Sequence, residues 1–207
     1  MTSRPAEALA RIVDRRLPVI EPLTIVAVVA LITAWTIQPF VTQALTPMGA
    51  AAQGAAQAAL WLSGVLAPLT ALMKAGAAAL ACWSCAVYLG ERLPLFKLVS
   101  MFCVAETTFA ARDLALAGVL IARGIESVHS TSDLMVAFGV NAFLHSPSAS
   151  ARIAFESWDA FTVAWGLLAF WMIRALFRID SRSSACMALV AFAFRILFSA
   201  ASLLYSL

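Results

Sequence analysis

The chain has 207 residues, of which 63% are apolar and only 12% are charged. An average soluble domain is about half apolar and about a quarter charged, so this composition excludes an ordinary soluble protein, which needs more polar surface to face water. The formal net charge is +3 and the arginines are scattered along the chain, which excludes a nucleic-acid-binding stripe. Composition therefore predicts a protein whose main partner is the lipid bilayer.

The apolar residues form long continuous runs rather than alternating segments of ten, which predicts an all-α polytopic transmembrane bundle. Residues 1–22 form an arginine-rich amphipathic segment, expected on the cytoplasmic surface. Residues 23–207 form the transmembrane domain, with five spans expected at about 23–45, 65–89, 94–122, 158–177 and 185–205. The first run is longer than the core of a signal peptide, so we expect a retained anchor.

Two connections between these spans have distinct characters. Residues 46–63 are small and glutamine-bearing without one Lys or Arg, and we expect a helical lead-in to the second span. Residues 123–157 form an outer loop that holds both histidines. Its apolar stretch, 134–144, is about half as long as a membrane crossing requires, so we expect a packed or interfacial helix there.

The distribution of Lys and Arg predicts the orientation. With the N-terminus inside, nine lie on the cytoplasmic side and two on the outer side. The positive-inside rule then favours an odd number of spans, with the C-terminus outside. The inner nine are Arg4, Arg11, Arg15, Arg16, Arg92, Lys97, Arg174, Arg178 and Arg182, and the outer two are Arg123 and Arg152.

Five ionisable side chains lie inside the apolar runs, namely Lys74, Glu106, Arg112, Asp113 and Arg195. Each costs about 2.5 to 3.5 kcal/mol at the centre of a membrane helix, so we expect them to pair. Depth along the helices matches Glu106 with Arg195 and Lys74 with Asp113. Glu106 and Asp113 are seven residues apart, on one helix face, which predicts a charged seam on the third span facing the second and fifth.

Two roles are open for this seam. The pairs can fix the register of the helices, with Arg112 meeting headgroups, a partner subunit or the surroundings of Asp113. Alternatively, they can serve a stand-alone channel or secondary transporter that moves ions or protons. The absence of an inverted repeat and the odd number of spans weigh against the second role.

No motif in the chain indicates catalysis. Cys82 and Cys85 form C-W-S-C, but all four cysteines fall in the expected cytoplasmic halves of their spans, a reducing side, and are interpreted as packing residues. We find no hydrolase elbow, zinc-protease motif or phosphate loop, so we expect a non-enzyme without cofactor or metal. An intramembrane redox or hydrolytic enzyme using Cys82 and Cys85, or His129 and His145, stays as an alternative.

The C-terminal third carries E-S-W-D-A-F-T-V-A-W from residue 156, followed by a cationic turn and a last apolar span. It resembles the end of the YIP family of five-span proteins, whose fourth span opens with Asp-x-Phe-Ser/Thr-Ile/Val-Trp. Asp159, Phe161, Thr162 and Val163 match this pattern, but the tryptophan is displaced by one position to Trp165.

The resemblance implies a scaffold without enzymatic activity. Eukaryotic members work in vesicle trafficking, and bacterial members occur as membrane accessories, some beside ABC-type exporters. Ala- and Gly-rich surfaces such as residues 49–58 also favour close helix association. We therefore expect an accessory subunit in a bacterial inner membrane, bound to other membrane subunits or to copies of itself.

Overall fold

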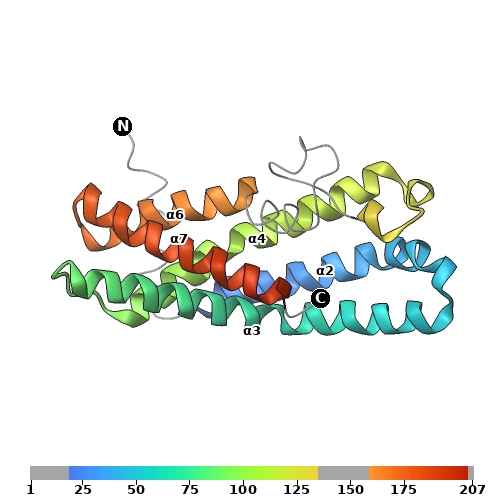
Figure 1. Ribbon diagram of the computed structural model, residues 1–207, viewed down its shortest axis with the longest axis horizontal. Helices are drawn as coiled ribbons and strands as arrows, with labels where there is room; N and C mark the ends of the chain where they lie inside the picture. The colour runs from blue at the N-terminus through green and yellow to red at the C-terminus, as the bar shows by residue number, and fades with distance from the viewer. Residues whose placement is uncertain (1–18, 135–158, 205–207) are drawn as a thin grey trace.

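The computed structural model describes residues 19–134 and 159–204, apart from the side chains of residues 131–132 and 198–204. Within these ranges the chain is all-helical and has no strand, as the sequence predicts. The long helices are α2 (Ile20–Ala44), α3 (Ala50–Tyr88), α4 (Leu95–Arg123), α6 (Ala160–Phe177) and α7 (Ser181–Leu204), and the short 3-10 turns are η1 (Thr46–Met48), η2 (Ile125–Ser127) and η3 (Thr131–Leu134) (Figure 1).

These helices overlap the five apolar segments of the sequence, with one difference. The expected lead-in and second span form the single 39-residue helix α3, which continues through Pro68. Helices in lipid tolerate proline better than helices in water, because neighbouring groups and local adjustments satisfy the freed backbone carbonyl. The expected cytoplasmic segment up to residue 18 and almost all of the expected helix 134–144 lie outside the described residues.

Three of the helices, α2, α3 and α6, are long and apolar enough to cross a membrane. These helices support integration into a bilayer. At 1.5 Å per residue, α3 is about 58 Å long, almost twice the roughly 30 Å of a hydrocarbon core. Helix α3 must therefore tilt strongly or extend beyond the core.

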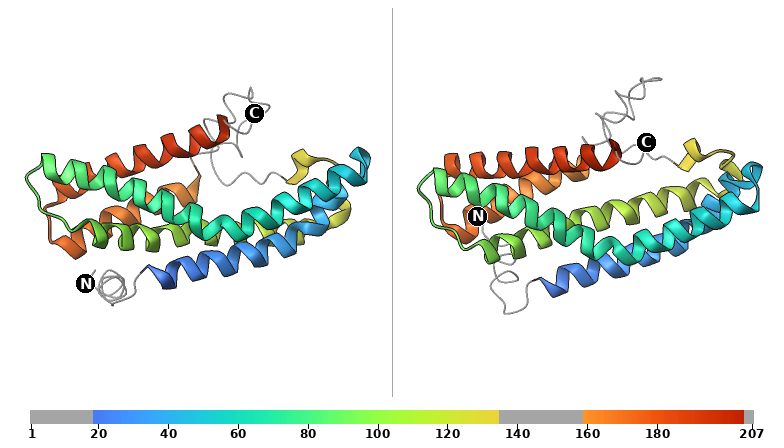
Figure 2. Two further views of the ribbon diagram at one scale, coloured as in Figure 1. Left: turned by 90° about the horizontal axis from the view of Figure 1, so that it is seen from below. Right: turned by 60° about the horizontal axis from the view of Figure 1, so that its bottom comes forward.

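Helix α4 lies at the centre of the bundle (Figures 1 and 2). Every residue from Ser100 to Glu106 is buried, so this stretch is covered on all sides of the helix. A helix that is surrounded in this way does not need an apolar face for lipid. This explains how α4 carries Glu106 among apolar residues, whereas Arg112 and Asp113 lie beyond this stretch and are partly exposed.

The outer surface of the bundle is largely apolar. Large apolar side chains are exposed on every long helix, among them Trp35 on α2 (70% exposed), Leu69 on α3 (55%) and Leu189 on α7 (66%). A soluble protein does not leave such continuous apolar surface uncovered. With large apolar groups outside and Glu106 and Arg195 buried inside, the distribution fits a lipid environment.

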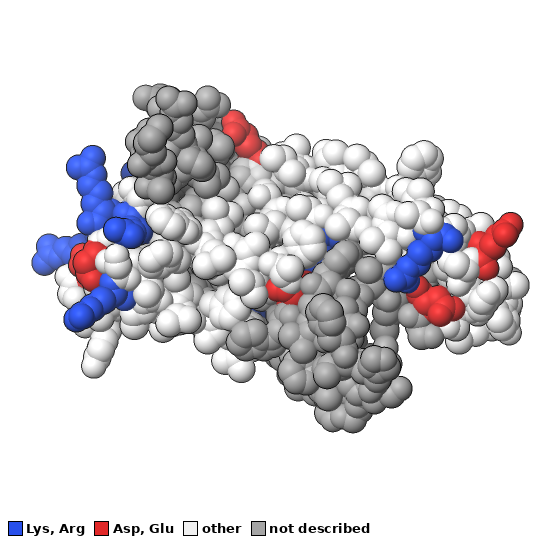
Figure 3. Space-filling model, turned by 90° about the horizontal axis from the view of Figure 1, so that it is seen from above, with Lys and Arg blue, Asp and Glu red and all other residues white. Residues whose placement is uncertain are grey.

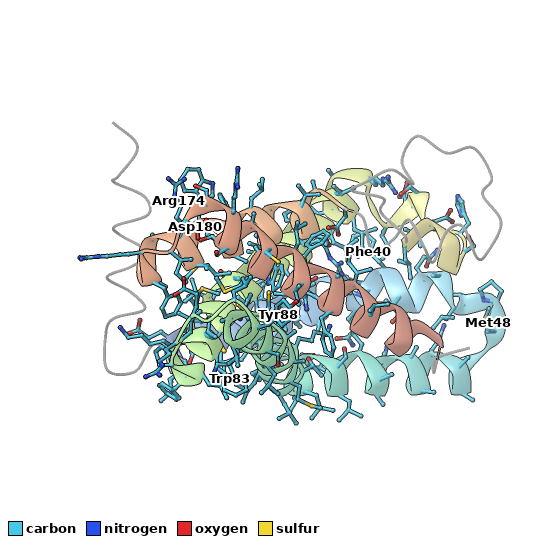
Figure 4. All side chains as sticks on the ribbon, turned by 60° about the vertical axis from the view of Figure 1, so that its left-hand side comes forward. Phe40, Met48, Trp83, Tyr88, Arg174 and Asp180 are labelled. Carbon is cyan, nitrogen blue, oxygen red and sulfur yellow. The ribbon has the colours of Figure 1, made fainter. Side chains whose placement is uncertain are left out.

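The bundle has two distinct ends. At one end α3 turns into α4 and α6 turns into α7, and Lys and Arg gather there (Figure 3). We call this the basic end. Its cationic residues are Arg92, Lys97, Arg174, Arg178 and Arg182, all exposed. Met48 lies at the opposite end from Arg174 and Asp180 (Figure 4).

The two ends also differ in the number of helices. Helices α6 and α7 lie in the half next to the basic end, where they pack with α3, α4 and the first part of α2, and we call this part the five-helix half (Figure 1). Beyond the start of α6 the bundle continues with α2, α3 and α4 (Figure 1), which we call the three-helix half. A small separate core of Phe40, Ala44, Leu120 and Val128 joins α2, α4 and the segment after α4 in this half.

Candidate functional site

Glu106 and Arg195 form an ion pair inside the five-helix half. Arg195 Nη2 lies 3.1 Å from Glu106 Oε2, and the side chains are only 5% and 3% exposed. The two residues come from α4 and α7 and are far apart in the sequence. Depth along the helices predicts this pairing, and the structure places the two groups in direct contact.

Aromatic side chains enclose the pair. The indole Nε1–H of the fully buried Trp165 donates a hydrogen bond to Glu106 Oε1 over 3.1 Å. The Arg195 guanidinium carbon lies 4.0 Å from the centre of the Phe109 ring and 5.3 Å from that of Trp165. Charge-assisted hydrogen bonds and cation–π contacts strengthen where water is excluded. These contacts offset part of the cost of burying the two charges.

Arg112 joins α4 to the start of α6. Its Nη1 lies 3.4 Å from Asp159 Oδ2, and its Nε lies 3.9 Å from Asp113 Oδ1. The other oxygen of Asp159 accepts the backbone N–H of Thr162 over 2.6 Å, which caps α6. One carboxylate therefore begins α6 and connects it to α4.

Lys74 does not pair with Asp113, the partner that equal depth along the helices predicts. It is half-buried on α3 and lies within electrostatic range of Glu106, Arg112, Asp113 and Arg195. Within the described residues it forms no ion pair with Asp113, whose ion pair is with Arg112. Depth predicts how far along a helix a side chain sits, but not the direction in which it points around the axis.

Six ionisable residues form what we call the charged cluster. It consists of Lys74, Glu106, Arg112, Asp113, Asp159 and Arg195. With all groups ionised it holds three cations and three anions, so its charges balance. Within the charged cluster, Arg195 Nη1 is a buried donor without a hydrogen-bond partner among the described residues.

The positions that match the YIP motif also lie in this region. Asp159 and Thr162 form the helix cap, and Trp165 binds Glu106. Phe161 is half-buried on α6. The motif residues thus have structural roles at the contact between α6 and α4.

Sequence reasoning did not identify Asp159, Phe109 and Trp165 as partners of the charged cluster, although it named Asp159 and Trp165 as motif positions. Asp159 lies at the boundary of the expected fourth span, so the sequence does not mark it as a charge inside the membrane. Phe109 and Trp165 resemble ordinary apolar residues. The available signal was the number of charges, because the three cations Lys74, Arg112 and Arg195 outnumber the two carboxylates Glu106 and Asp113 inside the apolar runs.

The four cysteines, all with free thiols, differ in their surroundings. Cys82 and Cys103 are completely buried and fill space between helices. Cys85 is half-buried and Cys186 is exposed. Their sulfurs lie 3.7 Å apart across the contact between α3 and α7. Within the described residues, no three His, Cys, Asp or Glu side chains gather as metal ligands.

Two aspartates in the connections order their turns. Asp133 accepts the backbone N–H groups of His129 and Ser130 and the Ser130 hydroxyl. These bonds, that of His129 first, hold the pKa of Asp133 below its usual value. Between α6 and α7, hydrogen bonds from the Ser183 hydroxyl and backbone, and from the Arg182 backbone, lower the pKa of Asp180.

Comparisons with protein-family models, with curated proteins and with solved structures find no match. The function therefore has to be argued from the bundle and its charged cluster.

Proposed function

We propose that the chain is a non-enzymatic inner-membrane protein that acts as an accessory or scaffold subunit of a larger membrane complex, such as an ABC-type exporter. The observation that carries the proposal is the enclosure of the Glu106–Arg195 ion pair under Trp165 and Phe109. A charge pair held in this way fixes how α4, α6 and α7 meet. It favours a rigid framework over a moving transporter.

The proposal includes five spans, with the N-terminus in the cytosol and the C-terminus outside. The cations at the basic end support this orientation by the positive-inside rule. Helix α4 crosses because α2, α3 and α6 cover its charged middle. A tag placed after Leu207 should be reachable only from outside intact cells, and labelling from the cytosol alone would contradict the topology.

The surface offered to another subunit is proposed to be the three-helix half. There α3 exposes a run of small residues, including Ala51, Gly54, Ala55 and Ala58. Small side chains let a partner helix approach closely. The resemblance to the YIP family supports the same accessory role.

Purification from the native membrane in mild detergent tests the accessory role. We expect other membrane subunits to co-purify in a fixed ratio with the tagged chain. Ala55→Trp should release them, because the large side chain blocks close approach. The matched control is Leu189→Trp on the exposed surface of α7, which should retain them. A chain that purifies alone would contradict the proposal.

One observation favours the rival function, a channel or transporter. Lys74 has no ion pair in the described part of the chain, and the buried Arg195 Nη1 has no hydrogen-bond partner there, so the cluster has groups left for a translocated ion. Glu106→Gln keeps the shape and the indole contact but removes the negative charge. If this variant folds and assembles normally yet loses solute flux in liposomes, the rival function replaces the first.

A further inference from the structure

The contact between α3 and α7 near the basic end contains two thiols from distant parts of the chain. Cys85 Sγ and Cys186 Sγ lie 3.7 Å apart, and 101 residues separate them in sequence. Cys85 is three residues before the end of α3, and Cys186 is five residues after the start of α7. Both thiols therefore lie within about 8 Å of the helix ends, measured at 1.5 Å per residue.

The sequence points to a different pair. The C-W-S-C spacing suggests Cys82 with Cys85, but Cys82 is completely buried among small residues. Cys186 lies on another helix and is exposed. A disulfide needs sulfurs about 2.05 Å apart, so Cys85 and Cys186 must approach by roughly 1.7 Å. Rotation of one exposed side chain can supply a movement of this size.

We infer that Cys85 and Cys186 form a site of reversible oxidation, in which a hydroperoxide joins α3 to α7 by a disulfide. This inference does not depend on the accessory role. The proposed orientation places the site at the cytosolic face, where the resting state is the reduced dithiol.

The exposed Cys186 reacts first. The Cys186 thiolate attacks one oxygen of hydrogen peroxide and becomes a sulfenic acid, and the other oxygen leaves as hydroxide, which takes up a proton. The Cys85 sulfur then attacks the Cys186 sulfur, and a second water leaves. In total, two thiols and one peroxide give one disulfide and two waters, and the peroxide receives two electrons.

The disulfide closes a covalent loop that contains α4 and α6, because both helices lie between the two cysteines in the chain. The basic end is then fixed in one arrangement. Reduction by a dithiol releases it again. The oxidised chain should unfold at a higher temperature and migrate faster on a non-reducing gel, since a cross-linked chain stays more compact when denatured.

The test uses the full chain in native membranes, treated with hydrogen peroxide, quenched with an alkylating agent, digested and analysed by mass spectrometry. We expect a Cys85–Cys186 linked peptide that disappears after treatment with dithiothreitol. Cys186→Ala and Cys85→Ala should abolish the linkage. Cys82→Ala and Cys103→Ala are the matched controls and should leave it unchanged. In Cys85→Ala, a dimedone probe should label the stranded sulfenic acid at Cys186.

Several results would overturn the inference. One is a Cys82–Cys186 or Cys82–Cys85 linkage in the wild-type chain. Another is a disulfide between two copies of the chain, visible as a dimer on the non-reducing gel. The third is labelling of Cys186 by dimedone in Cys85→Ala without any disulfide in the wild-type chain at the same peroxide dose. Since the wild-type peptide is itself decisive, the test does not depend on whether the variants fold.

Discussion

The five-helix half and the three-helix half use the same central helix in different ways. In the five-helix half, α4 is buried on all sides from Ser100 to Glu106 and packs in a core that contains Phe102 and Trp165. In the three-helix half, α4 buries only a stripe, with Ala117 and Leu120 inside and Ile121 59% exposed. The buried charge of α4, Glu106, lies where other helices complete its surroundings, whereas Arg112 and Asp113 are partly exposed.

The largest effect is expected from separating the ion pair of the five-helix half. Arg195→Leu leaves Glu106 buried without its cation, which should lower the free energy of unfolding by about 3 to 5 kcal/mol. The double variant Glu106→Leu/Arg195→Leu should be more stable than Arg195→Leu, because no charge of the pair is then left unpaired. Unfolding in mixed detergent micelles measures both. Leu189→Ala, on the exposed face of α7, is the control and should change stability little.

The view would be contradicted if Glu106→Leu/Arg195→Leu lost as much stability as Glu106→Leu and Arg195→Leu added together. The pair would then hold no coupling energy.

The next effect concerns how closely helices approach in each half. A Cβ added at Gly166 on α6 would lie 2.8 Å from Phe192 Cδ2 on α7, so Gly166→Ala should cost about 1 to 3 kcal/mol. Gly54 in the three-helix half has nothing within 4 Å of the added atom. Gly54→Ala should therefore be stabilising by about 0.5 to 1 kcal/mol. Thermal unfolding in detergent compares the two, and equal effects would remove the distinction between the halves.

A smaller effect is expected where the two halves join, at the start of α6. Asp159→Ala removes both the cap and the partner of Arg112, and loss of a cap costs about 1 kcal/mol. Asp159→Asn keeps the cap and removes only the charge. We expect Asn to recover most of the stability that Ala loses. If both variants lose the same amount, the ion pair rather than the cap is the dominant contribution.

The smallest effect is expected at the turn between α6 and α7. The pKa of Asp180 is lower in the folded chain than in the unfolded chain because the hydroxyl and backbone N–H of Ser183 hydrogen-bond the carboxylate. This contribution to stability is complete above the unfolded pKa of about 4 and is lost as the pH falls through the folded pKa. The melting temperature of the wild-type chain should fall faster over that interval than that of Asp180→Asn. Parallel curves would show that Asp180 does not contribute.

The sequence predicts where the helices of the five-helix half lie in the chain, but it predicts few of the contacts between their side chains. The length and continuity of the apolar runs locate the helices, since backbone groups in lipid need internal partners. Equal depth predicts that Glu106 meets Arg195. The same argument pairs Lys74 with Asp113, and there the structure differs, because rotation about the helix axis is set by packing rather than by depth.

The remaining contacts could not be read from the sequence because they depend on tertiary structure. Whether α3 is one helix or two is not decided by composition, since Pro68 permits either. The enclosure of Arg195 by Phe109 and Trp165 follows from the crossing of α4, α6 and α7. The Cys85–Cys186 contact also depends on how α3 and α7 cross.

The position of Arg195 near the end of the chain has a consequence for biosynthesis. Glu106 is made 89 residues before its cation, and at a translation rate of about 5 to 20 residues per second it waits roughly 4 to 18 seconds. In the proposed five-span topology, α4 enters the membrane during that interval, before the cation of its ion pair has been made. Lys74 on the preceding helix is the nearby cation already synthesised and in electrostatic range of Glu106. The proposed topology therefore gives Lys74 a role before α7 is made, as the temporary counter-ion of Glu106.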